Sequence, residues 1–118
     1  MKIKSFKELK IWQQGIEIVK EIYQLTKEFP KEELYGLTSQ IRRSAISIPS
    51  NIAEGFKRYH AKEFKQFLHV AFGSIAELET ELIIAREIGY IPDTKLGPIT
   101  EKIDYISKMM SSLLKKIF

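Results

Sequence analysis

Four stretches of the chain repeat apolar residues at alternating steps of three and four positions. This spacing places the side chains along one face of an α-helix. The pattern therefore predicts helices over residues 6–29, 37–58, 61–88 and 95–117. The third stretch is the most regular, and its repeating positions are Phe64, Leu68, Ala71, Ile75, Leu78, Leu82 and Ala85.

The first predicted helix carries two apolar stripes. One stripe consists of Leu9, Trp12, Ile16, Val19, Tyr23 and Thr26, and the other of Ile11, Ile18, Ile22, Leu25 and Phe29. Together they are wider than the apolar face of an ordinary surface helix. We therefore expect a fourth helix or another subunit to cover the excess. At the start of this helix, Ser5 and Glu8 have the spacing of a capping box.

A proline interrupts the apolar pattern of the second predicted helix. Pro49 lacks an amide donor, and its ring crowds the carbonyl of Ala45, so a kink at Pro49 is expected. Ser47 and Asn51 flank it and are able to bond to the local backbone. Two interpretations remain open. The segment is either a kinked core helix with small residues for close packing, or a kink that shapes a groove or interface.

The connections between the predicted helices are short, which makes sequential helices antiparallel neighbours. The sequence therefore predicts an all-α fold, an up-down-up-down antiparallel four-helix bundle in one domain over residues 1–118. Pro98 is expected in the first turn of the last helix, where a missing amide is tolerated. The chain has no cysteine, no long apolar run and no apolar signal core at its start, so a cytoplasmic protein is expected.

The net charge of +4 conceals an uneven distribution. In an alternating bundle, residues 1–17, 47–75 and 106–118 share one end, which has eleven lysine and arginine residues against four glutamates, or +7. The other end carries −3. A basic end is typical of proteins that bind polyanions, although lysines that only maintain solubility are the alternative. The candidate contacts are Lys57, Arg58, Lys62, Lys65 and Lys116 for phosphate and Tyr59 for base stacking.

No catalytic constellation is visible. A di-metal site in a helical bundle needs Glu-x-x-His motifs, and none occurs. Glu54, Glu77 and Glu81 are the nearest candidates for acid-base chemistry, but such carboxylates are more often a solvated face or ion-pair partners. We therefore expect no enzyme activity, no cofactor and no metal.

Three segments resemble a known family: QIRRSAISIPSNIAEGF, KEFKQFLHVAFGSIAELETEL and the turn Ile88-Gly89-Tyr90. They are similar to the bacterial four helix bundle protein family, whose members are also identified as proteins encoded in 23S rRNA intervening sequences. The most specific part spans residues 48–55 and includes the structural motif residues Pro49, Asn51, Glu54 and Gly55. The chain departs from the family pattern at the start of the third helix, where His60 replaces a small hydroxyl residue.

The resemblance implies a bundle that assembles as a ring-like homopentamer, without enzyme activity. It also implies kinship with accessory proteins of diversity-generating retroelements, which bind a reverse transcriptase and nucleic acid. Two hypotheses follow. The protein is either a homo-oligomer that binds RNA or DNA through its basic end, or a protein-interaction scaffold that does not contact nucleic acid.

Overall fold

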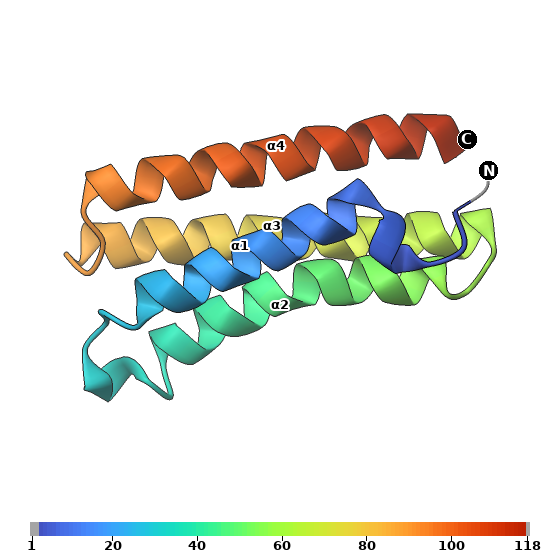
Figure 1. The fold of residues 1–118 in the computed structure, drawn as a ribbon. Coiled ribbons are helices and arrows are strands. Elements are labelled where there is room, and N and C mark those ends of the chain that lie inside the picture. Colours follow the sequence, from blue (N-terminus) through green and yellow to red (C-terminus); the bar gives the residue numbers. More distant parts are fainter. Residues whose placement is uncertain (1–2, 118) are drawn as a thin grey trace.

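The computed structural model describes residues 3–117 and consists of four long α-helices. They are α1 (Lys10–Thr26), α2 (Leu37–Phe56), α3 (Ala61–Glu87) and α4 (Asp93–Ile117). Successive helices run in opposite directions, and the first and last described residues lie at the same end of the bundle (Figure 1). Both α1 and α3 pack against α2 and α4. The prediction of an all-α, up-down-up-down four-helix bundle is confirmed.

The predicted first helix, residues 6–29, is wrong at both ends. A short 3-10 helix, η1 (Phe6–Glu8), comes first, and α1 begins only at Lys10. The extended backbone of Leu9 separates the two. The capping box is confirmed, but it caps η1: Ser5 Oγ accepts from the Lys7 amide at 3.2 Å, and the Glu8 carboxylate accepts from the Ser5 amide at 3.1 Å.

The other helices differ from the prediction by only a few residues. α2 ends at Phe56 and α3 at Glu87, slightly earlier than expected. α4 begins at Asp93, two residues earlier than expected, so Pro98 lies in its second turn and not in its first. A second 3-10 helix, η2 (Lys31–Glu33), connects α1 to α2. None of the helices in the described part of the chain combines the length and apolar character needed to span a bilayer.

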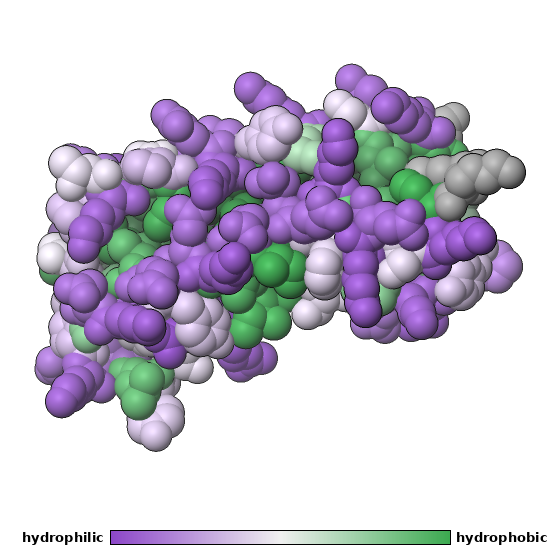
Figure 2. Space-filling model, viewed as in Figure 1, coloured by the Kyte–Doolittle hydropathy of each residue, from purple (hydrophilic) through white to green (hydrophobic). Residues whose placement is uncertain are grey.

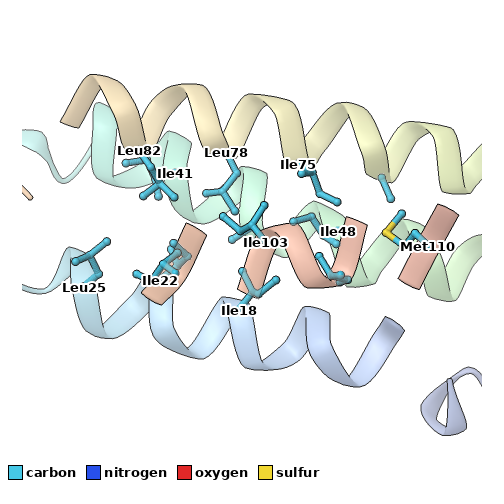
Figure 3. Packing of buried hydrophobic residues seen from close by; sticks show 14 of the residues in the cluster. Ile18, Ile22, Leu25, Ile41, Ile48, Ile75, Leu78, Leu82, Ile103 and Met110 are labelled. Carbon is cyan, nitrogen blue, oxygen red and sulfur yellow. The ribbon is translucent and has the colours of Figure 1, made fainter. Parts of the chain in front are cut away.

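All four helices contribute to one apolar core. Figure 3 shows side chains from each helix pointing into a shared interior, among them Ile22, Ile41, Leu78 and Ile103. Each of these four side chains is almost completely buried. Of the two stripes on the first helix, the one that contains Ile22 faces this core.

In the other stripe Leu9 and Thr26 are also buried, but Trp12, Ile16 and Val19 stay partly exposed and line an apolar groove between α1 and α2. Figure 2 shows an apolar patch over the middle of these two helices. The groove has a volume of about 340 Å³ and is lined by Phe6, Trp12, Ile16, Val19, Ile46, Pro49, Ser50 and Ala53. We call this surface the α1/α2 groove. Packing of α4 against α1 therefore covers only part of the excess apolar face.

Glycines allow α2 to approach both of its neighbours closely. A Cβ atom built on Gly15 of α1 would lie 3.1 Å from Cβ of Pro49, and one built on Gly55 would lie 2.6 Å from Cβ of Phe67. Real Cβ atoms do not approach as closely as the second distance. α2 continues through Pro49. Pro49 thus lies within α2, packs on Gly15 of α1 and also lines the α1/α2 groove.

A chain of polar groups links α2 to α3 beside the Pro49 contact, on its side remote from Gly55. The Asn51 amide donates to the Ser47 carbonyl at 2.8 Å and to Ser47 Oγ at 2.9 Å. Ser47 Oγ lies 2.7 Å from Ser74 Oγ, and Ser74 Oγ lies 3.3 Å from the Val70 carbonyl. Since Ser74 donates to that carbonyl, Ser47 donates to Ser74. The prediction that the small polar side chains around Pro49 bond to the local backbone is confirmed for Asn51, whereas Ser47 Oγ bonds to the side chains of Asn51 and Ser74.

Substitution of Gly55 by alanine tests the close contact between α2 and α3. The new methyl group would force Phe67 and Phe64 to move, because their atoms lie 2.6 and 3.1 Å from its position. We expect Gly55→Ala to lower the free energy of unfolding by about 1–3 kcal/mol, as overpacking does. Urea denaturation followed by circular dichroism measures this change.

Gly73→Ala is the matched control, since Gly73 also lies inside a helix. A Cβ atom at Gly73 meets no atom of the described chain within 4 Å. The substitution is therefore expected to stabilise the protein by about 0.5–1 kcal/mol through helix propensity alone. Equal effects of the two substitutions would show that the α2–α3 contact does not depend on Gly55.

Candidate nucleic-acid interface

The alternating helices bring distant parts of the chain together at one end of the bundle. This end, which we call the basic end, comprises the start of α1, the end of α2, the start of α3 and the end of α4 (Figure 1). One pocket there has walls from all of these parts, including Leu9, Phe56, Phe64 and Leu113. The sequence assigned eleven cations and four glutamates to this end. All of them except Lys2, which lies outside the described residues, belong to the segments that meet here.

The turn between α2 and α3 forms the tip of the basic end. Tyr59 adopts a left-handed backbone conformation with φ 58° and exposes 71% of its surface. This conformation is uncommon for a residue with a bulky side chain and costs roughly 1 kcal/mol. His60 then begins α3 in an extended conformation, and its side chain makes no capping bond to the described backbone. The turn thus presents an aromatic ring to solvent.

The structure places all five predicted phosphate-contacting cations on exposed positions of the basic end. Lys57 and Arg58 follow α2, Lys62 and Lys65 lie in the first two turns of α3, and Lys116 lies in the last turn of α4. Arg58 is also engaged with Glu54, whose carboxylate lies 3.0 Å from its guanidinium. Both side chains are about half-exposed, so this pair contributes little to stability and a phosphate group can compete for Arg58.

The motif residues of the second helix have mainly structural positions. Pro49 and Gly55 are buried at the two close helix contacts, and Asn51 bonds to Ser47 within α2. Glu54 is exposed and forms the ion pair with Arg58. Pro49, Asn51 and Gly55 therefore fix the position of α2 between its neighbours. Glu54 alone of the four lies at the edge of the basic end, where it pairs with Arg58.

An apolar pocket opens at the basic end, and the sequence did not predict it. Its volume is about 260 Å³, and its lining residues are Ile3, Leu9, Phe56, Tyr59, His60, Ala61, Phe64, Leu113 and Ile117. We call it the end pocket. The helical periodicity assigned Phe56, Phe64 and Leu113 to the core, and each is half-buried. Periodicity cannot distinguish a core residue from one that lines a pocket at the end of a bundle.

A second, polar pocket lies on the side of the bundle between α2 and α3. It has a volume of about 410 Å³ and is lined by Gln40, Arg43, Ser44, Ser47, Glu77 and Glu81. Oε1 of Glu81 is shielded from solvent and has no hydrogen-bond partner among the residues that the structure describes. Burial and, to a smaller extent, the charge of Glu77 raise the pKa of Glu81, while the Ser44 hydroxyl acts in the opposite direction.

Over residues 3–117, no three carboxylate or imidazole groups gather closely enough to hold a metal ion. Glu77 and Glu81 lie in the same pocket, as their spacing on one helix suggested, but far along the bundle from the basic end. Arg43 lies in the same pocket and was expected as an ion-pair partner of these carboxylates, whereas the position of Ser44 beside them was not predicted. It depends on how α2 is rotated against α3, which one sequence does not reveal.

Taken together, fold and surface define a small helical bundle with one cationic end. The chain matches the family model described as 23S rRNA-intervening sequence protein over residues 7–112, and it belongs to this family. The resemblance noted in the sequence is thereby confirmed. None of the curated proteins matches the chain.

A solved structure with the same fold comes from Bacteroides thetaiotaomicron. It is the crystal structure, at 1.70 Å resolution, of a protein of unknown function from the S23 ribosomal protein family. The two chains are 24% identical, with a TM-score of 0.81, and the match covers 89% of this chain and 98% of the other. This likeness shows the four-helix fold.

The raised pKa of Glu81 leads to a prediction about stability. The folded protein holds the Glu81 proton more tightly than the unfolded chain does, where the ordinary value is 4.5. The contribution of this group to stability is therefore complete below pH 4.5 and is lost as the pH rises through the folded-state pKa. We expect Glu81→Gln to be more stable than the parent above this window and equally stable below it, as measured by urea denaturation between pH 4 and about 7.

Glu101→Gln, which also removes one negative charge but at an exposed position of α4, is the control. Its effect is expected to stay small and to vary little over the same pH range, because no desolvated carboxyl is replaced. A loss of stability in Glu81→Gln at neutral pH would contradict the prediction, since it would mean that the ionised form is the favoured one in the fold.

Proposed function

We propose that the protein is a non-enzymatic, homo-oligomeric helical bundle that binds nucleic acid, with RNA as the first candidate, through its basic end. The observation that carries the proposal is the concentration of ten cations against four glutamates, among the described residues, within one end of the bundle. The positive electrostatic potential of such a cluster attracts polyanions and raises the rate at which they associate with the protein. We place this activity in the cytoplasm.

The family description supports an RNA context, because it associates these proteins with intervening sequences of 23S rRNA. The five candidate cations come from three separate segments that converge at the basic end. A phosphate backbone bound at this end is proposed to contact Lys57, Lys62 and Lys116. These contacts carry no sequence information, so affinity with little sequence preference is expected.

The α1/α2 groove supports self-association. It exposes an apolar surface along two helices, and contiguous apolar surfaces of this kind often mark interfaces between subunits. The number of five subunits comes from the family resemblance. In a cyclic assembly every basic end faces the same side, so the charge of one end is multiplied and weak contacts reinforce one another.

The alternative is a protein-interaction scaffold that does not bind nucleic acid. It is favoured by exposed apolar side chains on α3 and at its C-terminal cap, where Val70, Ile84 and Ile88 each keep about half of their surface in solvent. A protein partner that is lost when Glu77 and Glu81 are reversed in charge, but retained when the lysines are replaced, would support this alternative.

Nucleic-acid binding is tested with two matched triple variants. Lys57→Ala/Lys62→Ala/Lys116→Ala removes three exposed cations from the basic end, and Lys27→Ala/Lys31→Ala/Lys95→Ala removes three exposed cations from the opposite end. We expect the first to weaken binding to structured RNA and to lower the salt dependence by about 0.7–0.9 per lost phosphate contact. The second should bind nearly as the parent does.

Filter binding at about 50 and about 200 mM salt measures both quantities. The two triple variants carry the same net charge, so general attraction affects them equally. Equal losses in both variants would contradict a localised interface. Absence of binding by the parent protein at both salt concentrations would reject nucleic-acid binding altogether.

Self-association is tested by light scattering. A pentamer has five times the 13.7 kDa mass of one chain. We expect Ile46→Lys, which places a charge in the α1/α2 groove, to shift the protein to a smaller species. Tyr105→Lys is the control, because Tyr105 is a similarly exposed apolar residue on α4 outside the groove. A parent protein that is monomeric at micromolar concentration would overturn the proposed assembly.

A further inference from the structure

The end pocket has an aromatic wall. The Phe56 and Phe64 rings have centroids 6.1 Å apart and meet nearly edge to face, at 86°. The Phe56 and Tyr59 centroids are also 6.1 Å apart, with planes inclined by 61°. Leu113 and Ile117 of α4 contribute to the rest of the lining. The interior therefore suits the apolar face of a flat ring, and Tyr59 and His60 in the lining carry polar groups that can meet its edge.

The surroundings of the pocket have the opposite character. Lys57, Lys62 and Lys116 are exposed and each is the chain neighbour of a residue that lines the pocket, namely Phe56, Ala61 and Ile117. A ligand that satisfies both the interior and the rim combines an aromatic ring with a neighbouring anion. With about 260 Å³, the pocket is smaller than the roughly 300–1,000 Å³ of sites for drug-sized molecules, so it suits a single ring system.

Tyr59 stands at the mouth of the pocket. Its edge-to-face contact with Phe56 and its exposure of 71% leave much of the ring accessible. The left-handed backbone that carries it is strained for a non-glycine residue, and such strain persists where the surrounding structure holds it, often at binding sites. A base that stacks on Tyr59 would remain close to the lysines of the rim.

We propose that the end pocket accepts one unpaired nucleobase of a single-stranded or looped nucleic acid. Tyr59 stacks on the base, Phe56 and Phe64 line the apolar floor, and the rim lysines bind the adjoining phosphates. This inference rests on the proposed function and specifies its ligand. In a duplex the bases are already paired and stacked, so the pocket can be filled only at the cost of opening the helix.

The experiment compares a fluorescein-labelled single-stranded RNA with a duplex of the same sequence and length by anisotropy, using the full chain. We expect the parent protein to prefer the single strand, and Tyr59→Asn to reduce that affinity about tenfold, as expected for one stacked base. Asparagine tolerates the left-handed backbone, so the turn is retained. Tyr59→Phe keeps the ring and should bind as the parent does.

Ala61→Leu provides a second variant that does not alter the stacking residue. Ala61 is exposed and lines the pocket, so a larger aliphatic side chain should obstruct the opening while the core stays intact. We expect it to lower single-strand affinity while the affinity for the duplex and the salt dependence stay unchanged. The duplex affinity and the salt dependence both measure the contacts between lysines and phosphates. They therefore distinguish a loss of base stacking from a loss of phosphate binding at the basic end.

The outcomes distinguish this inference from the function on which it rests. If neither RNA binds, the proposed function fails and the inference fails with it. If both RNAs bind equally and Tyr59→Asn changes neither, the basic end is a general phosphate-binding surface and only the inference is overturned. Displacement of single-stranded RNA by dodecanoate but not by uridine monophosphate would assign the pocket to an aliphatic anion and would also overturn it.

Discussion

The arrangement of the bundle depends on the close packing of α2 against α1 and α3. At Gly15 and Gly55 the absence of a side chain lets a neighbouring helix come nearly into backbone contact. Two residues before Pro49, the hydroxyl groups of Ser47 and Ser74 join α2 to α3. Contacts at three separate heights leave α2 little freedom to slide or rotate. The segment around Pro49 is thus the element that holds the register of the other helices.

The surface chemistry follows from that register. Because α2 and α3 pack together in a fixed register, the turn that connects them has a defined position beside the start of α1 and the end of α4. Cations that are far apart in the chain, such as Lys57 and Lys116, thereby share one end. The same packing leaves the ends of the apolar seams incompletely filled, which creates a pocket with an aromatic wall next to those cations.

Much of this could be predicted because helical periodicity is a local property. The seams of α3 and α4 are buried nearly as their spacing indicated, and only Phe64, Leu113 and Ile117 at their ends stay half-buried. Helix ends were less predictable, since they depend on backbone geometry. Leu9 breaks the first helix in spite of a continuous apolar pattern, and Pro98 lies deeper in α4 than its helix propensity suggested.

The amino-acid sequence by itself determined four amphipathic helices, their alternating direction and the unequal charge of the two ends. Each follows from residue spacing, short connections and composition. Only the tertiary structure decided which stripe of α1 faces the core, that Glu81 is desolvated beside Ser44, and that Tyr59 borders an apolar pocket. These features depend on the rotation and separation of packed helices. Rotation and separation are set by contacts between residues remote in the chain, such as Gly15 with Pro49, and no local pattern encodes them.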